Sequence, residues 1–257
     1  MDYNYHTHTA RCGHASGEDE DYVRCAIEAG IKHLGFSDHA PFIFPDGFES
    51  NWRVPLSKAD DYVKSISKLR ENYSDKVEIN IGFEMEYYEE YFEKMLNIAR
   101  KHGAEYLILG QHFIYGEHSR GIGSVGPTDS EEHLSRYVDE VIAAMKTGVF
   151  SYVAHPDLVC FTGDDEVYKR HISRLCYASK ELNVPLEINM LGIRYKKHYP
   201  AEKFWQIVGE VGAPVTIGFD SHAPENFLDT DQHEVANGIV EKYKLNYIGM
   251  PSLIKIS

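Results

Sequence analysis

The stretch VEINIGFEMEYYEEYFEKMLNIARKHGAEYLILGQH, residues 77–112, contains one complete unit of the fold that the sequence predicts. Residues 77–84 are largely apolar and predict a buried strand, and the apolar spacing over residues 88–102 predicts an amphipathic helix. Gly103 follows that helix as a turn residue, and residues 106–110 predict the next strand. A strand, a crossover helix and a second strand are typical of a parallel sheet.

Similar units extend from this stretch to both ends of the chain. Further strands are predicted at residues 2–5, 33–37, 152–154, 186–189 and 215–219. Further helices are predicted near residues 18–29, 57–72, 130–147, 165–182 and 201–211. Seven strands that alternate with helices predict a single α/β domain over residues 1–257, a distorted (β/α)7 TIM-like barrel. Residues 246–250 are interpreted as either an eighth strand or a tail.

The composition limits the class of partner. With 40 acidic against 26 basic side chains the net charge is −14, which argues against nucleic acid and anionic membranes and favours a small-molecule substrate. The first fifteen residues lack the basic and apolar regions of a signal peptide. Four cysteines without a C-x-x-C pair fit reduced thiols, so we expect a cytoplasmic protein. The sequence does not indicate its oligomeric state.

Histidines, carboxylates and one amide stand at the predicted C-terminal ends of successive strands. They are His6, His8, Asp38, His39, Glu84, His112, His155, Glu187, Asn189, Asp220 and His222. In a parallel barrel these ends meet at one mouth, where such folds carry their chemistry. A single H-x-H pair is often a surface accident, but agreement across all the strands predicts a metal site.

These residues resemble the polymerase and histidinol phosphatase (PHP) family. The matching segments are H-T-H (6–8), C-G-H-A (12–15), S-D-H-A-P (37–41), G-F-E (82–84), G-Q-H-F (110–113), A-H-P-D (154–157), E-I-N-x-x-G-x-R (187–194) and F-D-S-H-A-P (219–224). They cover nearly the whole chain in order. Within the family, the S-D-H-A-P and E-I-N-M-L-G-I-R-Y segments most resemble the histidinol-phosphate phosphatases of histidine biosynthesis.

The resemblance implies the PHP fold and a centre of two or three divalent metal ions. The implied ligands form three sets, two of which share a glutamate: His6, His8, Glu84 and Asp220; Glu84, His112 and His155; and His14, His39 and His222. The mixture of imidazoles and carboxylates admits zinc, manganese or iron. The identity of the metal is therefore left open.

The resemblance also implies a reaction, the hydrolysis of L-histidinol phosphate to L-histidinol and inorganic phosphate. We expect a hydroxide that bridges two ions to attack phosphorus, with no covalent phosphoenzyme. Asp220 and His222 belong to the catalytic set together with Arg194 and Asp38. Asp38 is expected either to orient a ligating imidazole or to handle the leaving-group proton.

Four residues are candidates for substrate contacts. Arg194, after the sixth strand, is interpreted as a bidentate phosphate clamp or as a loop arginine paired with a carboxylate. The insert at residues 42–55 is expected to overhang the mouth, so that Trp52 and Arg53 contact the amine or imidazole end of the substrate, or to be a plain surface loop. His118 is a further candidate. The acidic run at residues 86–93 is interpreted as the solvated start of a helix.

Three alternatives remain open. The same metal site can serve another phosphate ester, such as a nucleotide phosphate, phosphotyrosine or a nucleic acid end, of which the last would favour a basic surface. A second alternative is a non-catalytic metal-binding module, although such modules commonly lose ligands. A third is an amidohydrolase-type barrel, which ordinarily needs a carboxylated lysine or an extra carboxylate where Gly110-Gln111-His112 stands.

Overall fold

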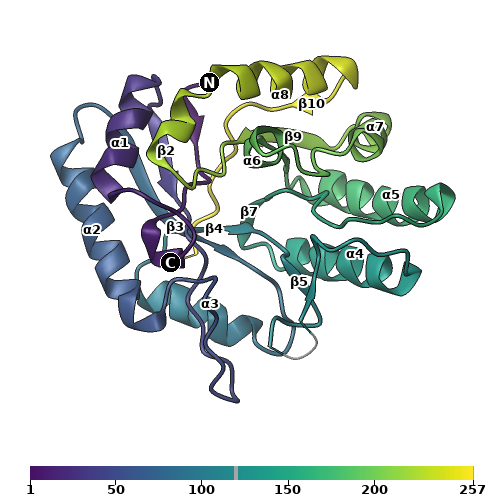
Figure 1. The fold of residues 1–257 in the computed structure, drawn as a ribbon, viewed down its shortest axis with the longest axis horizontal. Coiled ribbons are helices and arrows are strands. Elements are labelled where there is room, and N and C mark those ends of the chain that lie inside the picture. Colours follow the sequence, from purple (N-terminus) through teal and green to yellow (C-terminus); the bar gives the residue numbers. More distant parts are fainter. Residues whose placement is uncertain (119–120, 257) are drawn as a thin grey trace.

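The computed structural model describes residues 1–118 and 121–256. Eight strands form one parallel sheet in the order β1-β2-β3-β4-β7-β8-β9-β10 (Figure 1). The strands are β1 (Tyr3–Asn4), β2 (His33–Phe36), β3 (Glu78–Met85), β4 (Tyr106–Leu109), β7 (Phe150–Val153), β8 (Leu186–Asn189), β9 (Pro214–Gly218) and β10 (Asn246–Tyr247). The antiparallel pair β5 (Phe113–Ile114) and β6 (Ile122–Gly123) forms a separate small sheet.

Helices surround the sheet on its outer face (Figure 1). They are α1 (Asp19–Glu28), α2 (Ala59–Asn72), α3 (Phe92–Lys101), α4 (Glu131–Lys146), α5 (Asp165–Leu182), α6 (Met190–Arg194), α7 (Glu202–Val211) and α8 (Thr230–Lys242). Short 3-10 turns cover Ala10–Cys12, Leu56–Lys58 and Pro224–Leu228. Within the described ranges, no helix combines the length and the apolar character needed to cross a bilayer.

The sheet curls until β1 and β9 meet beyond their C-terminal ends. There the amide of His8 donates to the Ser221 carbonyl (2.9 Å), and the amide of Ser221 donates to the His6 carbonyl (3.1 Å). At the N-terminal end of β9, β10 pairs with it in parallel, and Asn246 lies beside Pro214. The expected distorted α/β barrel is therefore confirmed, and residues 246–247 supply its eighth strand as β10.

Period-2 alternation along the strands separates the two faces of the sheet. In β3 the side chains of Ile79, Ile81 and Phe83 belong to the main hydrophobic core beneath the helices, and burial of each contributes roughly 1.5–3 kcal/mol. The alternate positions Gly82 and Glu84 face the barrel interior, where a Cβ at Gly82 would meet the Tyr106 ring. Each strand thus sends one row outward to the helices and one row inward.

A cluster of tyrosines fills the interior at the N-terminal end of the barrel. This tyrosine plug consists of Tyr3, Tyr5, Tyr106 and Tyr152, which cluster with Ile108 and Ala154. The Tyr106 hydroxyl lies 2.9 Å from the carbonyl oxygen of Tyr5, to which it donates, and the Tyr3 hydroxyl lies 3.0 Å from Thr216 Oγ1. The plug closes one end of the barrel and forms the floor beneath the polar residues at the other end.

Candidate metal centre

Four side-chain atoms face one another inside the C-terminal mouth, and we call them the metal cage: His6 Nε2, His8 Nε2, Glu84 Oε2 and Asp220 Oδ1. Each imidazole nitrogen lies 3.5 Å from Glu84 Oε2. Their distances to Asp220 Oδ1 are 3.4 Å from His6 and 3.2 Å from His8. All four atoms are buried, and none has a hydrogen-bond partner among the described residues.

The spacing of the metal cage is that of a metal coordination shell. Ligands about 2.1 Å from a tetrahedral zinc ion lie about 3.4 Å from one another. A buried polar atom without a partner costs roughly 1–3 kcal/mol, and a single cation would satisfy all four atoms together. The donor set therefore fits a divalent metal ion.

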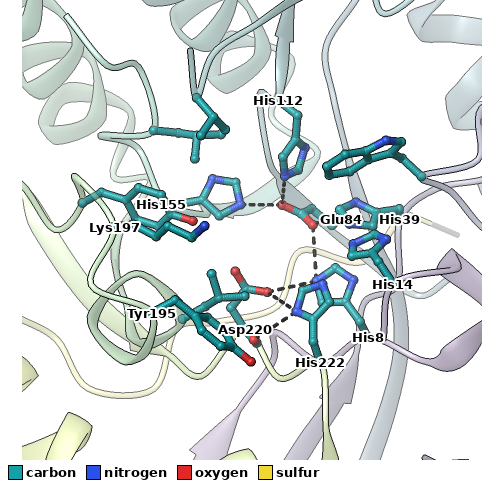
Figure 2. A pocket seen from close by; sticks show the side chains of 15 residues that line it. His8, His14, His39, Glu84, His112, His155, Tyr195, Lys197, Asp220 and His222 are labelled. Carbon is teal, nitrogen blue, oxygen red and sulfur yellow. Dashed lines mark hydrogen bonds and ion pairs between the residues drawn. The ribbon is translucent and has the colours of Figure 1, made fainter. Parts of the chain in front are cut away.

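Glu84 connects the metal cage to a second group of histidines. Its other oxygen, Oε1, lies 2.8 Å from His155 Nε2 and 3.5 Å from His112 Nε2 (Figure 2). His39 Nδ1 lies 3.2 Å from Glu84 Oε2. The carboxylate can thus bridge two ions, as the family resemblance implies.

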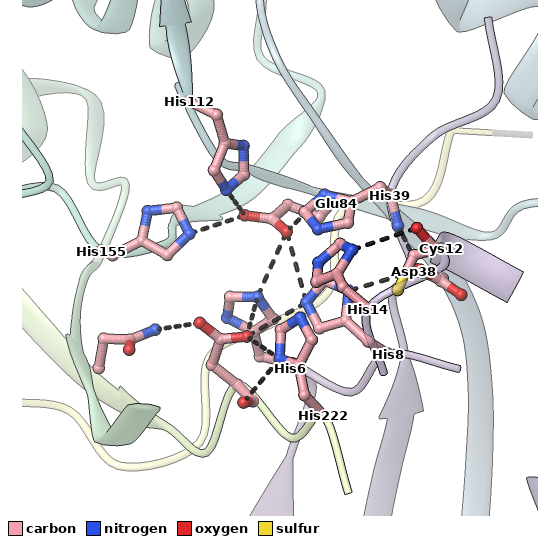
Figure 3. Close-up of polar contacts among 12 residues, drawn as sticks. His6, His8, Cys12, His14, Asp38, His39, Glu84, His112, His155 and His222 are labelled. Atoms are coloured by element: carbon pink, nitrogen blue, oxygen red, sulfur yellow. Dashed lines mark hydrogen bonds and ion pairs between the residues drawn. The ribbon is translucent and has the colours of Figure 1, made fainter. Parts of the chain in front are cut away.

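A third group of donors consists of imidazoles alone. Nitrogens of His14, His39 and His222 all lie within 4.8 Å of one another (Figure 3). Burial, together with the nearby imidazoles of His222 and His8, lowers the pKa of His14 to about 4. A neutral imidazole keeps the lone pair that a metal needs, so this group is ready to bind a cation.

The structure thus brings all nine expected ligands into one cluster. It does not separate them into the three ligand sets that the resemblance implies. The donor atoms of His39 also group with those of Glu84 and His112, and those of His155 group with His6 and Asp220. Some histidines can therefore serve either of two neighbouring ions. The assignment of each ligand to one ion stays a prediction.

Comparison with known proteins places this cluster in a family. The PHP domain matches residues 4–190 of the chain. The chain belongs to the PHP domain family. This confirms the resemblance found in the ordered motifs.

Two relatives of this PHP protein carry a named activity. A probable histidinol-phosphatase of Deinococcus radiodurans is 26% identical over 239 residues, which cover 85% of each chain. A probable histidinol-phosphatase of Schizosaccharomyces pombe is 26% identical over 283 residues, which cover 100% of this chain and 90% of the relative.

Solved structures share the fold. Histidinol phosphate phosphatase from Lactococcus lactis, in complex with zinc, L-histidinol and phosphate, aligns with a TM-score of 0.74 and 19% identity over 99% of this chain and 97% of that one. A putative histidinol phosphatase from Listeria monocytogenes aligns with a TM-score of 0.70 and 20% identity over 87% of this chain and 96% of that one.

The charges in the PHP site depend on burial and on close opposite partners. Burial lowers the pKa of His6, but the carboxylates of Asp220, Glu187 and Glu84 outweigh it and raise that pKa to about 10. Burial raises the pKa of Glu84, but the surrounding imidazoles outweigh it and hold that pKa well below its usual range. Glu84 is thus anionic, and without a metal the His6 imidazole holds a proton between its carboxylate neighbours.

Two of the PHP ligand candidates adopt a left-handed backbone. His155 lies two residues beyond the end of β7 with φ 31°, and Asp220 lies two residues beyond the end of β9 with φ 48°. A non-glycine residue in this region costs of order 1–3 kcal/mol and persists where the surroundings hold it. The strained turns point both side chains back into the mouth.

Glu187 and Asn189 support the metal cage from below. Glu187 Oε1 lies 2.9 Å from His6 Nδ1, and Oε2 accepts the amide N–H of His155 at 3.1 Å. Asn189 donates to Glu187 (2.9 Å) and to Asp220 Oδ2 (3.0 Å). Such partners fix the orientation of a ligating ring. The sequence predicts both residues at a strand end without a role, although their E-x-N alternation places both side chains on one face of β8.

Asp38 lies behind His8, away from the pocket. Its Oδ1 is 3.4 Å from His8 Nδ1 and accepts the amide N–H of His39 at 2.8 Å. Its Oδ2 accepts both the amide N–H and the hydroxyl of Thr9. Because the carboxylate is fully buried and occupied in this way, the geometry favours the orienting role over contact with the leaving group.

The interpretation of Glu86 as a solvated residue is wrong. Its side chain is buried, and its Oε1 lies 3.1 Å from His112 Nδ1. Its Oε2 accepts a hydrogen bond from Arg53 Nη1 at 2.6 Å. Arg53 also donates to Glu117 (2.9 Å). Arg53, which was expected to contact the substrate, instead lies buried between two carboxylates and supports His112 through Glu86.

A pocket of about 410 Å³ opens over the metal centre (Figure 2). Its walls combine the ligand candidates with Trp52, Val125, Leu158, Leu191, Tyr195, Lys197 and Tyr199. Of the expected substrate contacts, Trp52 lies on this wall. Arg194 does not, since it forms an ion pair with Asp229, and His118 stacks on Phe44 with ring centroids 4.2 Å apart.

Proposed function

We propose that this PHP protein is a metal-dependent phosphomonoesterase that hydrolyses L-histidinol phosphate to L-histidinol and inorganic phosphate in histidine biosynthesis. The observation that carries the proposal is the metal cage, in which four buried atoms without a hydrogen-bond partner among the described residues lie at ligand spacing beneath a pocket of small-molecule size. The two relatives named probable histidinol-phosphatase, each aligned over at least 85% of both chains, support the substrate.

Bound divalent ions would supply a nucleophile from water at neutral pH and neutralise charge on the phosphoryl group. The chain's own task is to hold and orient the ligands. His6, His8, Glu84 and Asp220 form the cage, and rings are oriented from behind by the carboxylates of Glu187, Asp38 and Glu86. Since these supports are buried, the ligand rings stay fixed while substrate enters and leaves.

We propose Asp220 and His222 as members of the catalytic set, because both line the pocket and His222 Nδ1 lies 3.2 Å from Asp220 Oδ1. Arg194 remains a proposed phosphate contact. Its terminal nitrogens are buried and have no hydrogen-bond partner among the described residues, and reaching the pocket requires it to leave Asp229.

We also propose that residues 1–257 act as one catalytic domain. The support is that ligand candidates from both ends of the chain, from His6 to His222, lie in one cluster. A cytoplasmic location is part of the proposal, and the four free cysteines support it.

The test is phosphate release by protein that a chelator has stripped and that Mn²⁺, Zn²⁺ or Fe²⁺ has refilled. L-Histidinol phosphate is assayed beside a nucleotide monophosphate and a phosphotyrosine peptide. We expect release that depends on metal and strongly favours L-histidinol phosphate. Release from the other esters alone would overturn the substrate, and no release from any of the three would overturn the phosphatase.

A further inference from the structure

We propose that Lys197 binds the phosphate group of the substrate from the pocket wall, beside the metal cage. This inference rests on the proposed function, because it assigns a contact for that substrate. It adds a residue that none of the ordered PHP motifs contains.

The inference rests on the positively charged side chains that line the pocket. Among the described residues that line the pocket, Lys197 is the one lysine or arginine side chain. The two arginines expected to contact substrate are committed elsewhere, Arg53 to two buried carboxylates and Arg194 to Asp229. While Arg194 stays paired with Asp229, Lys197 is the lysine or arginine that a phosphate dianion in the pocket meets, and Arg194 would add a second charge only on leaving Asp229.

The ammonium group of Lys197 is available for an anion. Lys197 is solvent-exposed, and no described residue forms an ion pair with it. In Figure 2 its side chain enters the pocket from the side that carries His155. A lysine offers three donors on a flexible stem, so it can follow phosphate oxygens as the substrate moves against the metal centre.

The backbone around Lys197 is held in place by the end of α6. Lys196 adopts a left-handed conformation with φ 49°, and the amide of Lys197 donates to the Gly192 carbonyl at 2.9 Å. The chain then returns across Gly192, where any Cβ would overlap the Tyr199 carbonyl oxygen. Tyr199 itself is buried and lines the pocket. Gly192 thus lets the segment pack closely enough for Lys197 to reach the mouth.

Three variants of the full-length, metal-loaded chain test the contact: Lys197→Met, which removes the charge, Lys197→Arg, which keeps it, and Lys196→Met as the neighbouring control. Calorimetry gives the Kd of inorganic phosphate and, separately, of L-histidinol, and the metal content of each variant is measured. The KM for L-histidinol phosphate is measured in parallel.

We expect Lys197→Met to weaken phosphate binding about 10- to 100-fold, as loss of a charge-assisted hydrogen bond does, and to raise KM in the same direction. Binding of L-histidinol and of metal should be unchanged, Lys197→Arg should restore most of the affinity, and Lys196→Met should match the wild type. Unchanged phosphate affinity in Lys197→Met would overturn the inference, as would equal losses for phosphate and L-histidinol.

The two proposals can fail separately. A wild-type chain that binds phosphate through Lys197 but releases none from L-histidinol phosphate would overturn the proposed substrate and leave the contact standing. If the wild type hydrolyses L-histidinol phosphate and Lys197→Met binds phosphate as tightly as the wild type, the proposed substrate stands and the Lys197 contact is overturned.

Discussion

The two ends of the barrel interior are built from the same strands but treat their polar atoms differently. In the tyrosine plug, the Tyr106 hydroxyl donates to backbone carbonyls and the Tyr3 hydroxyl pairs with Thr216. In the metal cage, four polar atoms are also buried and have no hydrogen-bond partner among the described residues. Native proteins rarely leave such atoms unpaired. Because the four atoms also lie at ligand spacing, they mark a place that fits a divalent cation.

The largest effect on phosphate release is expected from Glu84→Gln, which removes a donor oxygen from the metal cage. Glu84 lies within 3.5 Å of five imidazoles, those of His6, His8, His39, His112 and His155. An amide replaces one ligand oxygen by an NH₂ group that cannot bind a metal. We expect a fall in phosphate release of roughly a thousandfold or more, with loss of bound metal. Metal content and rate after refilling check this, and wild-type values for both would contradict it.

Gly110→Ala should have the next largest effect, because it disturbs the same carboxylate indirectly. A Cβ at Gly110 would overlap Glu84 Oε1, and the backbone there suits any residue. Displacement of a catalytic group by about 1 Å can cost on the order of 100-fold in rate. The matched control is Gly123→Ala, where a Cβ meets nothing within 4 Å. Equal rates and metal contents for the two variants would show that Gly110 does not shape the cage.

Glu187→Gln should have a smaller effect, because Glu187 contacts a ligand ring and not the metal. The loss of the carboxylate beside His6 Nδ1 is expected to weaken metal binding about 10- to 100-fold. Competition with a chelator measures the affinity. Glu78→Gln is the control, since Glu78 pairs with His33 at 3.0 Å on the surface. The account is contradicted if both variants hold metal as the wild type does.

Tyr106→Phe tests the tyrosine plug, where we expect an effect on stability and not on metal binding. Removal of the hydroxyl leaves the carbonyls of Tyr5 and Phe36 without this donor, which should cost roughly 1–3 kcal/mol in the free energy of unfolding. Metal content and phosphate release should stay at wild-type values. Denaturant unfolding of the metal-loaded protein gives the stability. A loss of metal without a loss of stability would mean that the two ends are not independent.

Much of the fold follows from local patterns. Apolar alternation and helical spacing predicted the strands of the barrel and helices α1 to α5 and α7, and the structure contains each of them. Helix α8 (Thr230–Lys242) was missed because Ala236 is its one buried residue, so its sequence carries almost no apolar stripe. The pair β5–β6 was missed because two-residue strands have no period to detect.

In the candidate site, too, residues placed by local sequence patterns were predictable, and residues placed by tertiary contacts were not. Ligand candidates such as His155 and Asp220 were predictable because each directly follows a predicted strand, and the strands of a parallel barrel end at one mouth. Glu86 was misinterpreted because its burial depends on Arg53, a residue 33 positions away. The ion pair between Arg194 and Asp229 likewise depends on the packing of α6 against α8, which no local pattern reveals.

The most direct test of the central claim is the number of metal ions that the stripped chain takes up. The protein is refilled with Zn²⁺ or Mn²⁺, desalted and analysed for metal per chain, while circular dichroism checks that it is folded. The account predicts two or three ions per chain, and none retained at the cage in Glu84→Gln. Less than one ion per folded wild-type chain would contradict it, because the unpaired donors of His6, His8, Glu84 and Asp220 would then have no cation to bind.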